Sequence, residues 1–407
     1  MKKMLITIIV IVFIIGIVLA LITMISARKS DEVDNDEGNL VEYVTVNMTT
    51  ESTEEKTEEV IFSPAEDTFQ RVDTNNTTTT DEATDNSGAS SDSSSPDKYT
   101  VNQNTEDTKA PVFLINSKNV NVNKGTPFDV HSYIGYADDV DRDVELIMDG
   151  SVNTAETGTY HVTITLKDDA GHTTSSDMTV NVNEGSAPPP EDDGPSTRPG
   201  TESFESFDSE YRKAGTQLGL DVSRWQGSID FNKVKAEGCD FVILRIGGYD
   251  DNEFYTDRCY QEYLQGAKAA GLKVGVYWHA EDSTPEEARA SVKYMLDVLD
   301  GEKLDFPIAY DWEDFLGFED YKMNLQDIND CFEVFADEVE AAGYEACLYS
   351  SLNFLETVWT NTRNHKVWLA HYTSQTDYTG SYYMWQHTSS GRIDGVNCAV
   401  DFNVLYE

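Results

Sequence analysis

Apolar residues follow different patterns along the chain, and these patterns divide it into segments. Leu5–Ile25 is an uncharged run that is apolar almost throughout. In residues 109–183, apolar positions recur at spacing two, as in Val120 and Val122, which is the period of a half-buried β-strand. From residue 216 onward, short apolar strands alternate with helical segments. The stretches between these regions are polar and lack a sustained period, which predicts linkers.

The N-terminal apolar run predicts a membrane anchor. At ~1.5 Å of rise per residue, a helix of Leu5–Ile25 spans the ~30 Å hydrocarbon core of a bilayer. A cleavable signal peptide has an apolar core of only ~7–15 residues. We therefore expect residues 1–30 to be a transmembrane signal anchor of a single-pass protein, with the remaining chain outside the cell membrane. Cleavage at Ser26-Ala27, which gives a secreted protein, is the alternative.

Two polar segments predict linkers of different stiffness. Residues 31–108 are rich in Ser, Thr, Asn and acidic residues and contain few aromatics. Such a composition buries too little apolar surface to offset the entropy of ordering, so we expect a disordered acidic spacer. Residues 184–215 contain Pro188-Pro189-Pro190 followed by Gly and Ser, which predicts a second linker that is partly stiffened by proline.

Residues 109–183 are expected to form a small all-β sandwich. Turn-forming residues separate the apolar stretches at Lys124–Pro127, Asp149-Gly150 and Asp169–Gly171. About seven short strands in this length are typical of an immunoglobulin-like sandwich, and the segment resembles the Ig-like modules of bacterial surface proteins. Four acids in one stretch either bind calcium or belong to a solvated loop, and we favour the loop: Asp138, Asp139, Asp141 and Asp143.

The C-terminal region, residues 216–407, is expected to fold as a modified (β/α) barrel. Helical segments are expected at Asp257–Ala270, Pro285–Leu299 and Leu325–Ala342. Strands are expected at Leu218–Ser223, Phe241–Gly247, Lys273–Ala280, Phe306–Glu313, Glu345–Ser351, Lys366–Thr373, Tyr382–Thr388 and Cys398–Val404. A parallel crossover needs ~10–12 residues, so the short gaps between the last three strands predict partly antiparallel pairing. We therefore expect about five strand–helix units followed by three strands.

Charge and cysteine content exclude several classes of function. The chain has 29 Lys and Arg residues against 74 Asp and Glu, a formal charge of −45, which repels nucleic acid. Its five cysteines all follow residue 238 and form no CxxC pair, so we expect neither a disulfide scaffold nor a zinc site. Most of them are expected to be buried thiols, and one disulfide is the alternative. We expect no cofactor and no catalytic metal, and the sequence does not determine the oligomeric state.

Four carboxyl side chains lie on or near the ends of the predicted barrel strands, where barrel enzymes gather their function: Asp221, Asp311, Glu313 and Asp401. Residues two apart on a strand share a face, roughly 6–7 Å from each other, so Asp311 and Glu313 point one way and Trp312 the other. Two carboxylates at that range in an apolar cleft repel, and one should keep its proton to higher pH. Glycoside hydrolases use such a pair, with one protonated carboxyl group and one carboxylate. An Asp-x-Glu motif alone, however, arises by chance in so acidic a chain.

Aromatic residues near the strand ends either bind the faces of sugar rings or pack in the core, and the sequence leaves both interpretations open. They are Tyr277, Tyr349, Tyr372 and Trp385. Arg245 is expected to form an ion pair inside the barrel, and His279 and His371 lack the clustering of metal ligands.

Several motifs of the C-terminal region, in order, resemble glycoside hydrolase family 25, the Chalaropsis-type lysozymes. The opening motif is Leu220-Asp221-Val222-Ser223-Arg224-Trp225-Gln226-Gly227. The later motifs are Phe241–Arg245, Ala270–Tyr277, Asp311-Trp312-Glu313, Trp368–Tyr372, Trp385–Gly391 and Val400–Asn403. The resemblance covers essentially all of residues 216–407, and ordered motifs are more specific than any single one. One departure is Trp278-His279 after Tyr277, where the family often has His directly after Tyr.

The resemblance implies a β-1,4-N-acetylmuramidase that cuts peptidoglycan between N-acetylmuramic acid and N-acetylglucosamine. It implies Glu313 as the general acid and Asp311 as the group that stabilises the transition state, by orienting the substrate's N-acetyl group in a retaining route. Asp221 and Asp401 match the other cleft carboxylates of the family. The residues that match groove-lining positions are Tyr277, Tyr349, Tyr372 and Trp385. Spacing in the sequence does not by itself distinguish a retaining from an inverting outcome.

Three hypotheses follow for the whole chain. The first is a cell-surface muramidase that acts on peptidoglycan glycan strands and is carried by the anchor, spacer, sandwich and linker. The second is a surface adhesion protein whose barrel binds glycan without cutting it. The third is another barrel glycosidase, such as a chitinase. The complete set of four acids favours the first, while the sequence assigns neither the physiological role nor the partner of the sandwich.

Overall fold

The computed structural model describes residues 107–185, 200–250, 253–360, 362 and 364–406. The expected membrane anchor and nearly all of the expected spacer lie outside these residues. Within the described part of the chain, no helix combines the length and the apolar character needed to cross a bilayer.

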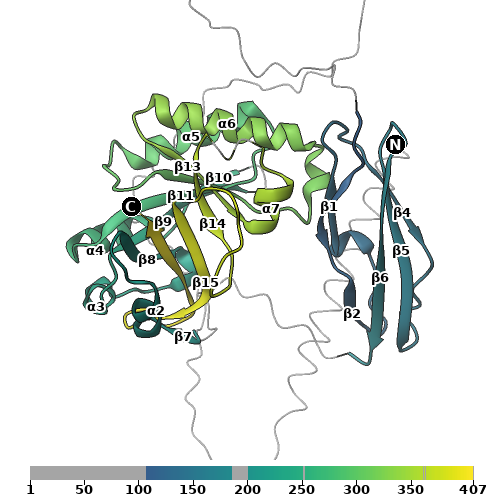
Figure 1. The fold of residues 1–407 in the computed structure, drawn as a ribbon, viewed down its shortest axis with the longest axis horizontal. Helices are drawn as coiled ribbons and strands as arrows, with labels where there is room; N and C mark the ends of the chain where they lie inside the picture. Colours follow the sequence, from purple (N-terminus) through teal and green to yellow (C-terminus); the bar gives the residue numbers. More distant parts are fainter. Residues whose placement is uncertain (1–106, 186–199, 251–252, 361, 363, 407) are drawn as a thin grey trace, which may run out of the picture. The chain divides into compact units, whose positions relative to one another are not determined.

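Residues 112–183 fold into a sandwich of six strands in two sheets (Figure 1). The strands are β1 (Val112–Asn116), β2 (Asn119–Asn123), β3 (Ile134–Ala137), β4 (Glu145–Asp149), β5 (Gly158–Lys167) and β6 (Thr173–Asn183). β1 pairs with β3, and the second sheet has the order β2-β6-β5-β4, in which β2 and β6 are parallel. Alternate residues of β5, namely Val162, Ile164 and Leu166, are buried in the core of the sandwich, as their spacing predicts.

The six strands of the described sandwich compare with about seven expected. Val130, an apolar β-branched residue of this segment, begins a short 3-10 helix (Val130–Ser132). Asp129 caps this helix, because its Oδ1 accepts a hydrogen bond from the backbone N–H of His131 at 3.1 Å. A local bond from side chain to backbone therefore overrides the strand preference of a β-branched residue here.

The C-terminal region forms a closed barrel of eight strands with helices around it (Figure 1). The strands are β8 (Thr216–Val222), β9 (Phe241–Asp250), β11 (Lys273–Ala280), β12 (Ile308–Trp312), β13 (Ala346–Ser351), β14 (Lys366–Ala370), β15 (Met384–Arg392) and β16 (Val400–Tyr406). Neighbouring strands are parallel from β8 to β15, whereas β16 is antiparallel to both β15 and β8. The prediction of a modified barrel is confirmed.

A helix follows each of the first five barrel strands. These helices are α3 (Phe231–Ala236), α4 (Tyr260–Ala269), α5 (Pro285–Leu299), α6 (Leu325–Ala341) and α7 (Leu352–Thr357). Thr284 caps α5 by accepting a hydrogen bond from the Glu287 N–H at 3.2 Å, and Asn324 and Asp327 form a capping box at the start of α6. α5 ends where Asp300 adopts a left-handed conformation, with φ of 48°.

Two connections in the barrel differ from the expected ones. β14 and β15 are parallel although no helix joins them. The strand ends expected from the sequence left too few residues between these two strands for a parallel crossover. In the structure the connection is longer, residues 371–383, and this is about the length of a dozen residues that a parallel crossover needs. β10 (Glu253–Thr256), a strand that the pattern did not predict, pairs with the end of β9 as an antiparallel hairpin.

The folded C-terminal region begins before residue 216, which corrects the expected linker at residues 184–215. Part of this segment forms β7 (Glu202–Ser203) and α2 (Phe204–Tyr211). Phe204 and Phe207 are buried against Phe402 of β16, with ring centroids 5.3 and 4.9 Å from it. The apolar face of this eight-residue helix is too short to be recognised as a periodic pattern within a polar segment of the sequence. In the structure, it covers apolar surface of the barrel.

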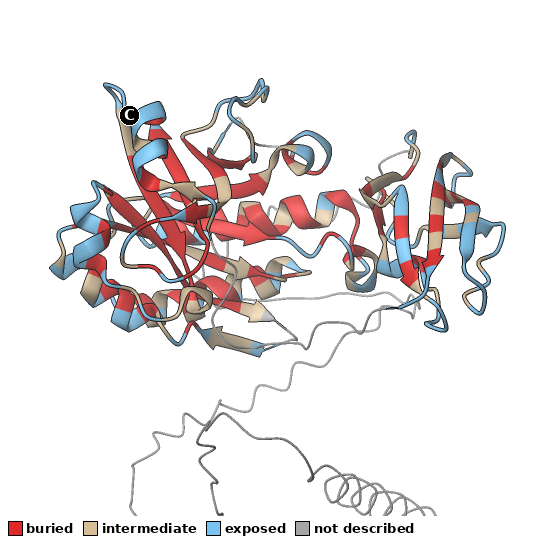
Figure 2. Cartoon of the chain, turned by 90° about the horizontal axis from the view of Figure 1, so that it is seen from below, coloured by how far each residue is buried: buried red, intermediate tan, exposed pale blue. Residues whose placement is uncertain are grey.

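Alternation along the strands sorts the barrel residues into two layers. On β12, Ile308, Tyr310 and Trp312 belong to the core between the strands and the helices. The opposite faces of the strands fill the barrel interior with Phe241, Ile243, Ala309, Cys347, Trp368 and Met384. Figure 2 shows the strands buried along most of their length and exposed residues on the helices around them. The interior is therefore a packed apolar layer, and polar residues follow it at one end.

All five cysteines are free thiols in the barrel. Cys239, Cys331, Cys347 and Cys398 are buried, and Cys259 is half-buried. Burial raises the pKa of the Cys239 thiol to about 12, because the thiolate is poorly solvated there. The prediction of mostly buried thiols is confirmed.

Candidate active site

A polar pocket lies at the end of the barrel where the parallel strands finish, and every strand of the barrel contributes to it. The lining residues are Asp221, Val222, Ser223, Trp225, Gln226, Arg245, Tyr277, His279, Asp311, Glu313, Tyr349, Trp368, Tyr372, Gln386 and Asp401. The structure thus brings the four carboxyl residues singled out in the sequence into one pocket.

β12 directs two of these carboxyl groups into the pocket by strand alternation. Ala309 lies in the barrel interior and Asp311 follows on the same face, while Trp312 is buried on the outer face. The indole Nε1 of Trp312 donates a hydrogen bond to the backbone oxygen of Asp282 at 3.2 Å, which fixes the end of β12. Glu313 follows directly after the strand and lines the opening of the pocket.

Asp401 reaches the same end of the barrel because β16 runs against its neighbours. It lies near the start of β16 and pairs in register with Asp221, near the end of β8. In a purely parallel barrel, a residue near the start of a strand lies at the opposite end. The antiparallel last strand therefore both closes the barrel and adds a carboxyl group to the pocket.

Asp221 is a buried carboxyl group held by two amide donors. Its Oδ2 accepts hydrogen bonds from Asn403 Nδ2 at 2.7 Å and from Gln386 Nε2 at 3.0 Å. Burial raises the pKa of Asp221 to about 6, and the two amides oppose this rise because they stabilise the carboxylate. Asn403 is fixed in turn by Trp368, whose Nε1 donates to Asn403 Oδ1 at 2.8 Å.

Burial disfavours the ionised form of the Asp311 carboxyl group. It is only 5% exposed, and its Oδ1 is buried with no hydrogen-bond partner among the described residues. Burial raises the pKa of Asp311 well above its usual range; the charges of Glu313 and Asp221 raise it further, and Arg245 opposes the shift. A group that donates a hydrogen bond to Oδ1 would instead stabilise the carboxylate.

Glu313 is open to solvent on one side and enclosed by the pocket walls on the others. Its carboxyl group forms no hydrogen bond or ion pair within the residues that the structure describes. Enclosure raises the pKa of Glu313 to about 7, and the charge of Asp221 contributes to the rise. Much of this group therefore carries its proton at neutral pH, where an ordinary glutamate is ionised.

Arg245 enters the pocket as part of a buried ion pair. Its Nε donates to Asp257 Oδ2 at 2.8 Å, and the two side chains are 7% and 1% exposed. Asp257 Oδ2 also accepts the backbone N–H of Arg224 at 3.0 Å. The prediction that Arg245 forms an ion pair inside the barrel is confirmed, and its charge lies near Asp311 and Tyr277.

The sequence around this pocket matches a known family. Residues 220–396 match the sequence model of glycosyl hydrolases family 25. Residues 220–396 therefore form a family 25 glycosyl hydrolase domain. Residues 114–182 match the Ig-like domain of bacterial surface proteins. Both resemblances found in the sequence are confirmed, and the pocket belongs to the family 25 domain.

Relatives of the family 25 domain come from several bacteria. The autolytic lysozyme of Clostridium acetobutylicum is 29% identical over 191 residues, which cover 46% of this chain and 56% of that protein. The chain therefore spans little more than half the length of that relative. The uncharacterised protein YegX of Escherichia coli K12 is 28% identical over 193 residues, which cover 46% of this chain and 68% of YegX. The solved structure of the Clostridium perfringens spore cortex lytic enzyme SleM is 20% identical, with a TM-score of 0.42, covering 48% of this chain and 68% of that one.

Three of the four predicted aromatic residues line the pocket of the family 25 domain. Tyr277 and Tyr349 lie inside the pocket, and Tyr372 is 57% exposed at its edge. The hydroxyl groups of Tyr349 and Tyr372 both donate to Gln386 Oε1, each at 2.9 Å. Tyr372 therefore presents its ring to solvent while its hydroxyl group is held in place.

Trp385 is not among the residues that line the pocket, which corrects its expected position. It is 3% exposed and packs on the outer face of β15, where its ring meets that of Tyr211 edge-on at 5.6 Å. Its Nε1 donates to the backbone oxygen of His371 at 2.8 Å. Alternation along β15 turns the next residue, Gln386, into the pocket instead.

Gln386 and Asn403 are site residues that the sequence analysis did not single out. Both belong to motifs that resemble family 25, but a neutral amide carries no charge that would indicate a catalytic or binding role. The available signal was spacing, because Asn403 follows Asp401 by two positions and so shares its face of the strand. His279 also lines the pocket, in register with Asp311 on the neighbouring strand.

Groups of side chains with the spacing of metal ligands are found in the Ig-like domain. They are Asp107, Asp168 and His172, and Asp107, Asp138 and Asp141. None of the four pocket carboxyl residues belongs to either group.

Proposed function

We propose that this chain is a cell-surface peptidoglycan hydrolase, a muramidase that cuts the β-1,4 bond between N-acetylmuramic acid and N-acetylglucosamine. The observation that carries the proposal is the meeting of Glu313, whose pKa is about 7, with Asp311 and Asp221 in one pocket. The family of the domain and the autolytic lysozyme among its relatives support the same chemistry.

Glu313 acts as the general acid in this proposal. Its proton goes to the oxygen of the scissile bond, the bond from that oxygen to C1 of N-acetylmuramic acid breaks, and the N-acetylglucosamine portion leaves as an alcohol. A pKa near 7 suits the step, because the group holds its proton at neutral pH and still releases it readily. Water then attacks C1, the bond that the substrate's own acetamido oxygen has formed to C1 breaks, and the proton that the water loses returns to the carboxylate of Glu313.

Asp311 and Asp221 stabilise the positive charge that develops on the sugar as the bond breaks. The free Oδ1 of Asp311 accepts the N–H of the substrate's acetamido group, which directs the acetamido oxygen toward C1 for attack. This hydrogen bond also favours the ionised form of Asp311, which burial alone disfavours. Asp221, held by two amides, keeps a second negative charge beside the sugar.

The remaining polar and aromatic groups bind the glycan. The exposed ring of Tyr372 offers an apolar face of the kind that packs against a sugar ring. Asp401, at the same end of the barrel, accepts hydrogen bonds from sugar hydroxyl groups. Binding therefore combines a flat apolar surface with acceptors at fixed positions.

Mass spectrometry of digests of purified peptidoglycan tests the proposal. We expect products that carry N-acetylmuramic acid at the new reducing end. Glu313→Gln should lose about 10²–10⁴-fold in rate, which is the usual contribution of a general acid. Its circular dichroism spectrum and glycan binding should match those of the wild type. The matched control is Glu340→Gln, at an exposed position of α6, which should retain full activity.

Other outcomes of this experiment select other functions. Cleavage of chitin oligomers but not of peptidoglycan, or N-acetylglucosamine at the new reducing end, identifies a different glycosidase. Unchanged glycan length with binding retained identifies a glycan-binding adhesion protein. A Glu313→Gln variant as active as the wild type removes Glu313 from the acid role.

We also propose that the family 25 domain works outside the cell, tethered by Leu5–Ile25. The length and apolar character of this run support the proposal. The chain should remain in the membrane fraction after an alkaline carbonate wash, and protease added to intact cells should remove the barrel. A variant without residues 1–30 serves as the control that is not membrane-bound. Recovery of the full-length protein's barrel from the medium, with a new N-terminus near Ala27, would indicate cleavage and secretion instead.

A further inference from the structure

Three carboxylates from two segments of the Ig-like domain meet at one point. Asp107 precedes β1, while Asp138 and Asp141 lie between β3 and β4. One carboxylate oxygen of each residue lies within 4.8 Å of the other two. Among the described residues, no Lys or Arg side chain forms an ion pair with any of the three. His172 Nδ1 lies 3.6 Å from Asp107 Oδ2, so the repulsion is offset in part at Asp107 when the imidazole is protonated, and not at Asp138 or Asp141.

Two of these carboxylates are buried with one oxygen that accepts no hydrogen bond. Asp138 is 1% exposed; its Oδ1 accepts the backbone N–H groups of Val140 and Asp141 at 2.8 and 2.9 Å, and its Oδ2 has no partner. The side chain of Asp107 is 10% exposed; its Oδ1 accepts the Lys109 N–H at 3.2 Å, and its Oδ2 is buried with no hydrogen-bond partner. Because a buried carboxylate oxygen without a partner is costly, both atoms point to a missing ligand.

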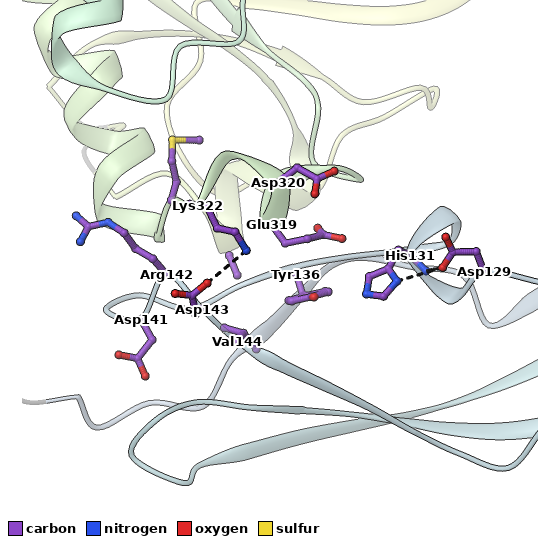
Figure 3. A pocket seen from close by; sticks show the side chains of 12 residues that line it. Asp129, His131, Tyr136, Asp141, Arg142, Asp143, Val144, Glu319, Asp320 and Lys322 are labelled. Carbon is purple, nitrogen blue, oxygen red and sulfur yellow. Dashed lines mark hydrogen bonds and ion pairs between the residues drawn. The ribbon is translucent and has the colours of Figure 1, made fainter. Parts of the chain in front are cut away.

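The other acids in this stretch have partners of their own. Asp139 forms an ion pair with Lys109 through Oδ2, while its Oδ1 has no hydrogen-bond partner, and Asp143 forms an ion pair with Lys322 at 3.3 Å. Figure 3 shows the Asp143 carboxylate turned toward Lys322, whereas the Asp141 side chain points away from it. The four acids grouped by the sequence are therefore divided into two that are ion-paired and two that join Asp107.

We propose that Asp107, Asp138 and Asp141 bind a calcium ion. Ca²⁺ prefers oxygen ligands, and carboxylates above all. At Ca²⁺–O distances of ~2.3–2.6 Å, oxygens on opposite sides of the ion lie up to ~5 Å apart, so carboxylate oxygens within 4.8 Å of one another suit this ion. The ion supplies the partner that Asp138 Oδ2 lacks, gives a direct contact to Asp107 Oδ2, which lies 3.6 Å from His172 Nδ1, and reduces the repulsion among the three carboxylates.

The nearby imidazole is already satisfied without a metal. His172 Nδ1 lies 2.9 Å from Asp168 Oδ2 and 3.6 Å from Asp107 Oδ2. Asp168 Oδ1 accepts the backbone N–H groups of Gly171 and His172 at 2.6 and 2.7 Å, so both of its oxygens have partners. This separates the calcium site from the group that contains His172. Zinc, which readily takes imidazole ligands, is therefore the competing ion in the test.

Calcium at this site would tie the entry of the chain into the Ig-like domain to a loop of the sandwich. Asp107 is the first residue that the structure describes, whereas Asp138 and Asp141 follow β3. An ion that binds only the folded arrangement stabilises it in proportion to the logarithm of the calcium concentration. The stability of the Ig-like domain should therefore follow the calcium level outside the cell.

Titration calorimetry of the full chain with calcium tests the site. The chain is kept in mild detergent because of its apolar N-terminal run and is first freed of divalent ions. We expect a site with a Kd of ~0.1–1 mM, typical of extracellular modules, above a weak background from the acidic surface. Asp138→Asn should abolish this site. Asp143→Asn, the matched control in the same stretch, should leave it unchanged.

Thermal unfolding of the Ig-like domain within the full chain gives an independent readout. The asparagine of Asp138→Asn keeps the acceptor for the two backbone N–H groups and removes a buried charge. Without calcium, this variant should therefore be at least as stable as the wild type. At a calcium concentration about a hundredfold above the Kd, the Tm of the wild type should rise by roughly 10 °C, and that of Asp138→Asn should not change.

Several results would overturn the calcium site. These are equal calcium binding by the wild type and Asp138→Asn, a Tm that calcium does not change, or saturation by zinc but not by calcium. A purely structural role of Asp138 makes a different prediction, namely that the substitution lowers the Tm equally with and without calcium. Peptidoglycan cleavage is measured separately, so failure of this proposal leaves the hydrolase proposal standing, and the reverse also holds.

Discussion

Gln386 Nε2 donates a 3.0 Å hydrogen bond to Asp221 Oδ2, and this contact links a carboxylate of the pocket to its aromatic wall. The Oε1 of the same amide accepts the hydroxyl groups of Tyr349 and Tyr372. One side chain thus orients a carboxylate and two aromatic rings. Because the amide is neutral, it stabilises the ionised form of Asp221 without adding a positive charge that would lower the pKa of Glu313.

Gln386→Leu should move the acidic limb of the pH profile. Loss of the donor removes a hydrogen bond that holds down the pKa of Asp221, and a hydrogen bond to a charged group is worth about 1.5–3 kcal/mol. In a plot of kcat/KM on peptidoglycan against pH, the acidic limb, which reports ionisation of Asp221, should move to higher pH by about 1–2 units. Gln326→Leu, on the exposed face of α6, is the control and should leave the profile unchanged. An unshifted limb in Gln386→Leu would separate this amide from the ionisation of Asp221.

Activity should fall as pH rises through about 7, the pKa of Glu313. A general acid must carry its proton, and the protonated fraction decreases above the pKa, about tenfold for each pH unit. Ionisation of Asp221, with a pKa of about 6, supplies the rising limb below this. The profile of kcat/KM against pH should therefore be a narrow bell between these values. Activity that continues to rise above pH 8 would contradict the role given to Glu313.

Asp311→Asn should raise the stability of the barrel at neutral pH while abolishing turnover. The folded-state pKa of Asp311 lies above its unfolded value of 3.8, so the native state binds its proton more tightly. The free energy of unfolding therefore falls as pH rises above that value, and the substitution should restore the lost part of it at pH 8. The gain should vanish below about pH 4, where both forms are protonated.

Urea unfolding followed by tryptophan fluorescence measures this gain, because all six tryptophans lie in the barrel. Asp297→Asn, at an exposed position of α5, is the control and should change stability little at any pH. A destabilised Asp311→Asn variant at pH 8 would show that the buried carboxylate is better satisfied than its free Oδ1 indicates.

Arg245→Met should destabilise the barrel by about 3–5 kcal/mol, because it leaves the buried carboxylate of Asp257 without its cation. Adding Asp257→Leu should recover part of this loss in the free energy of unfolding, since both charges are then absent. Lys268→Met removes the cation of an exposed pair with Glu302 and should cost no more than about 1 kcal/mol. Equal losses of unfolding free energy from Arg245→Met and Lys268→Met would show that burial does not make the Arg245–Asp257 pair more important for stability than the exposed pair.

Strand alternation predicted the opposite facing of Asp311 and Trp312, but it gives no prediction where a strand is buried on both faces. Asp311 and Trp312 take opposite faces of β12, as the period of two requires. On β15, by contrast, Met384–His387 are all buried, so the sequence has no polar side that tells the barrel interior from the outer core. Contacts with the neighbouring strands and with α2 decide which of Trp385 and Gln386 points into the barrel and which points outward.

The sequence by itself determined the features that depend on near neighbours: the strand periods, the ordered motifs and the choice of acids. These are local because each rests on residues a few positions apart. The tertiary structure alone decided the parallel return from β14 to β15, the inward turn of Gln386, and the meeting of Asp107 with Asp138 and Asp141. Each of these depends on contacts between residues far apart in the chain, and no local pattern specifies which distant residues will pack together.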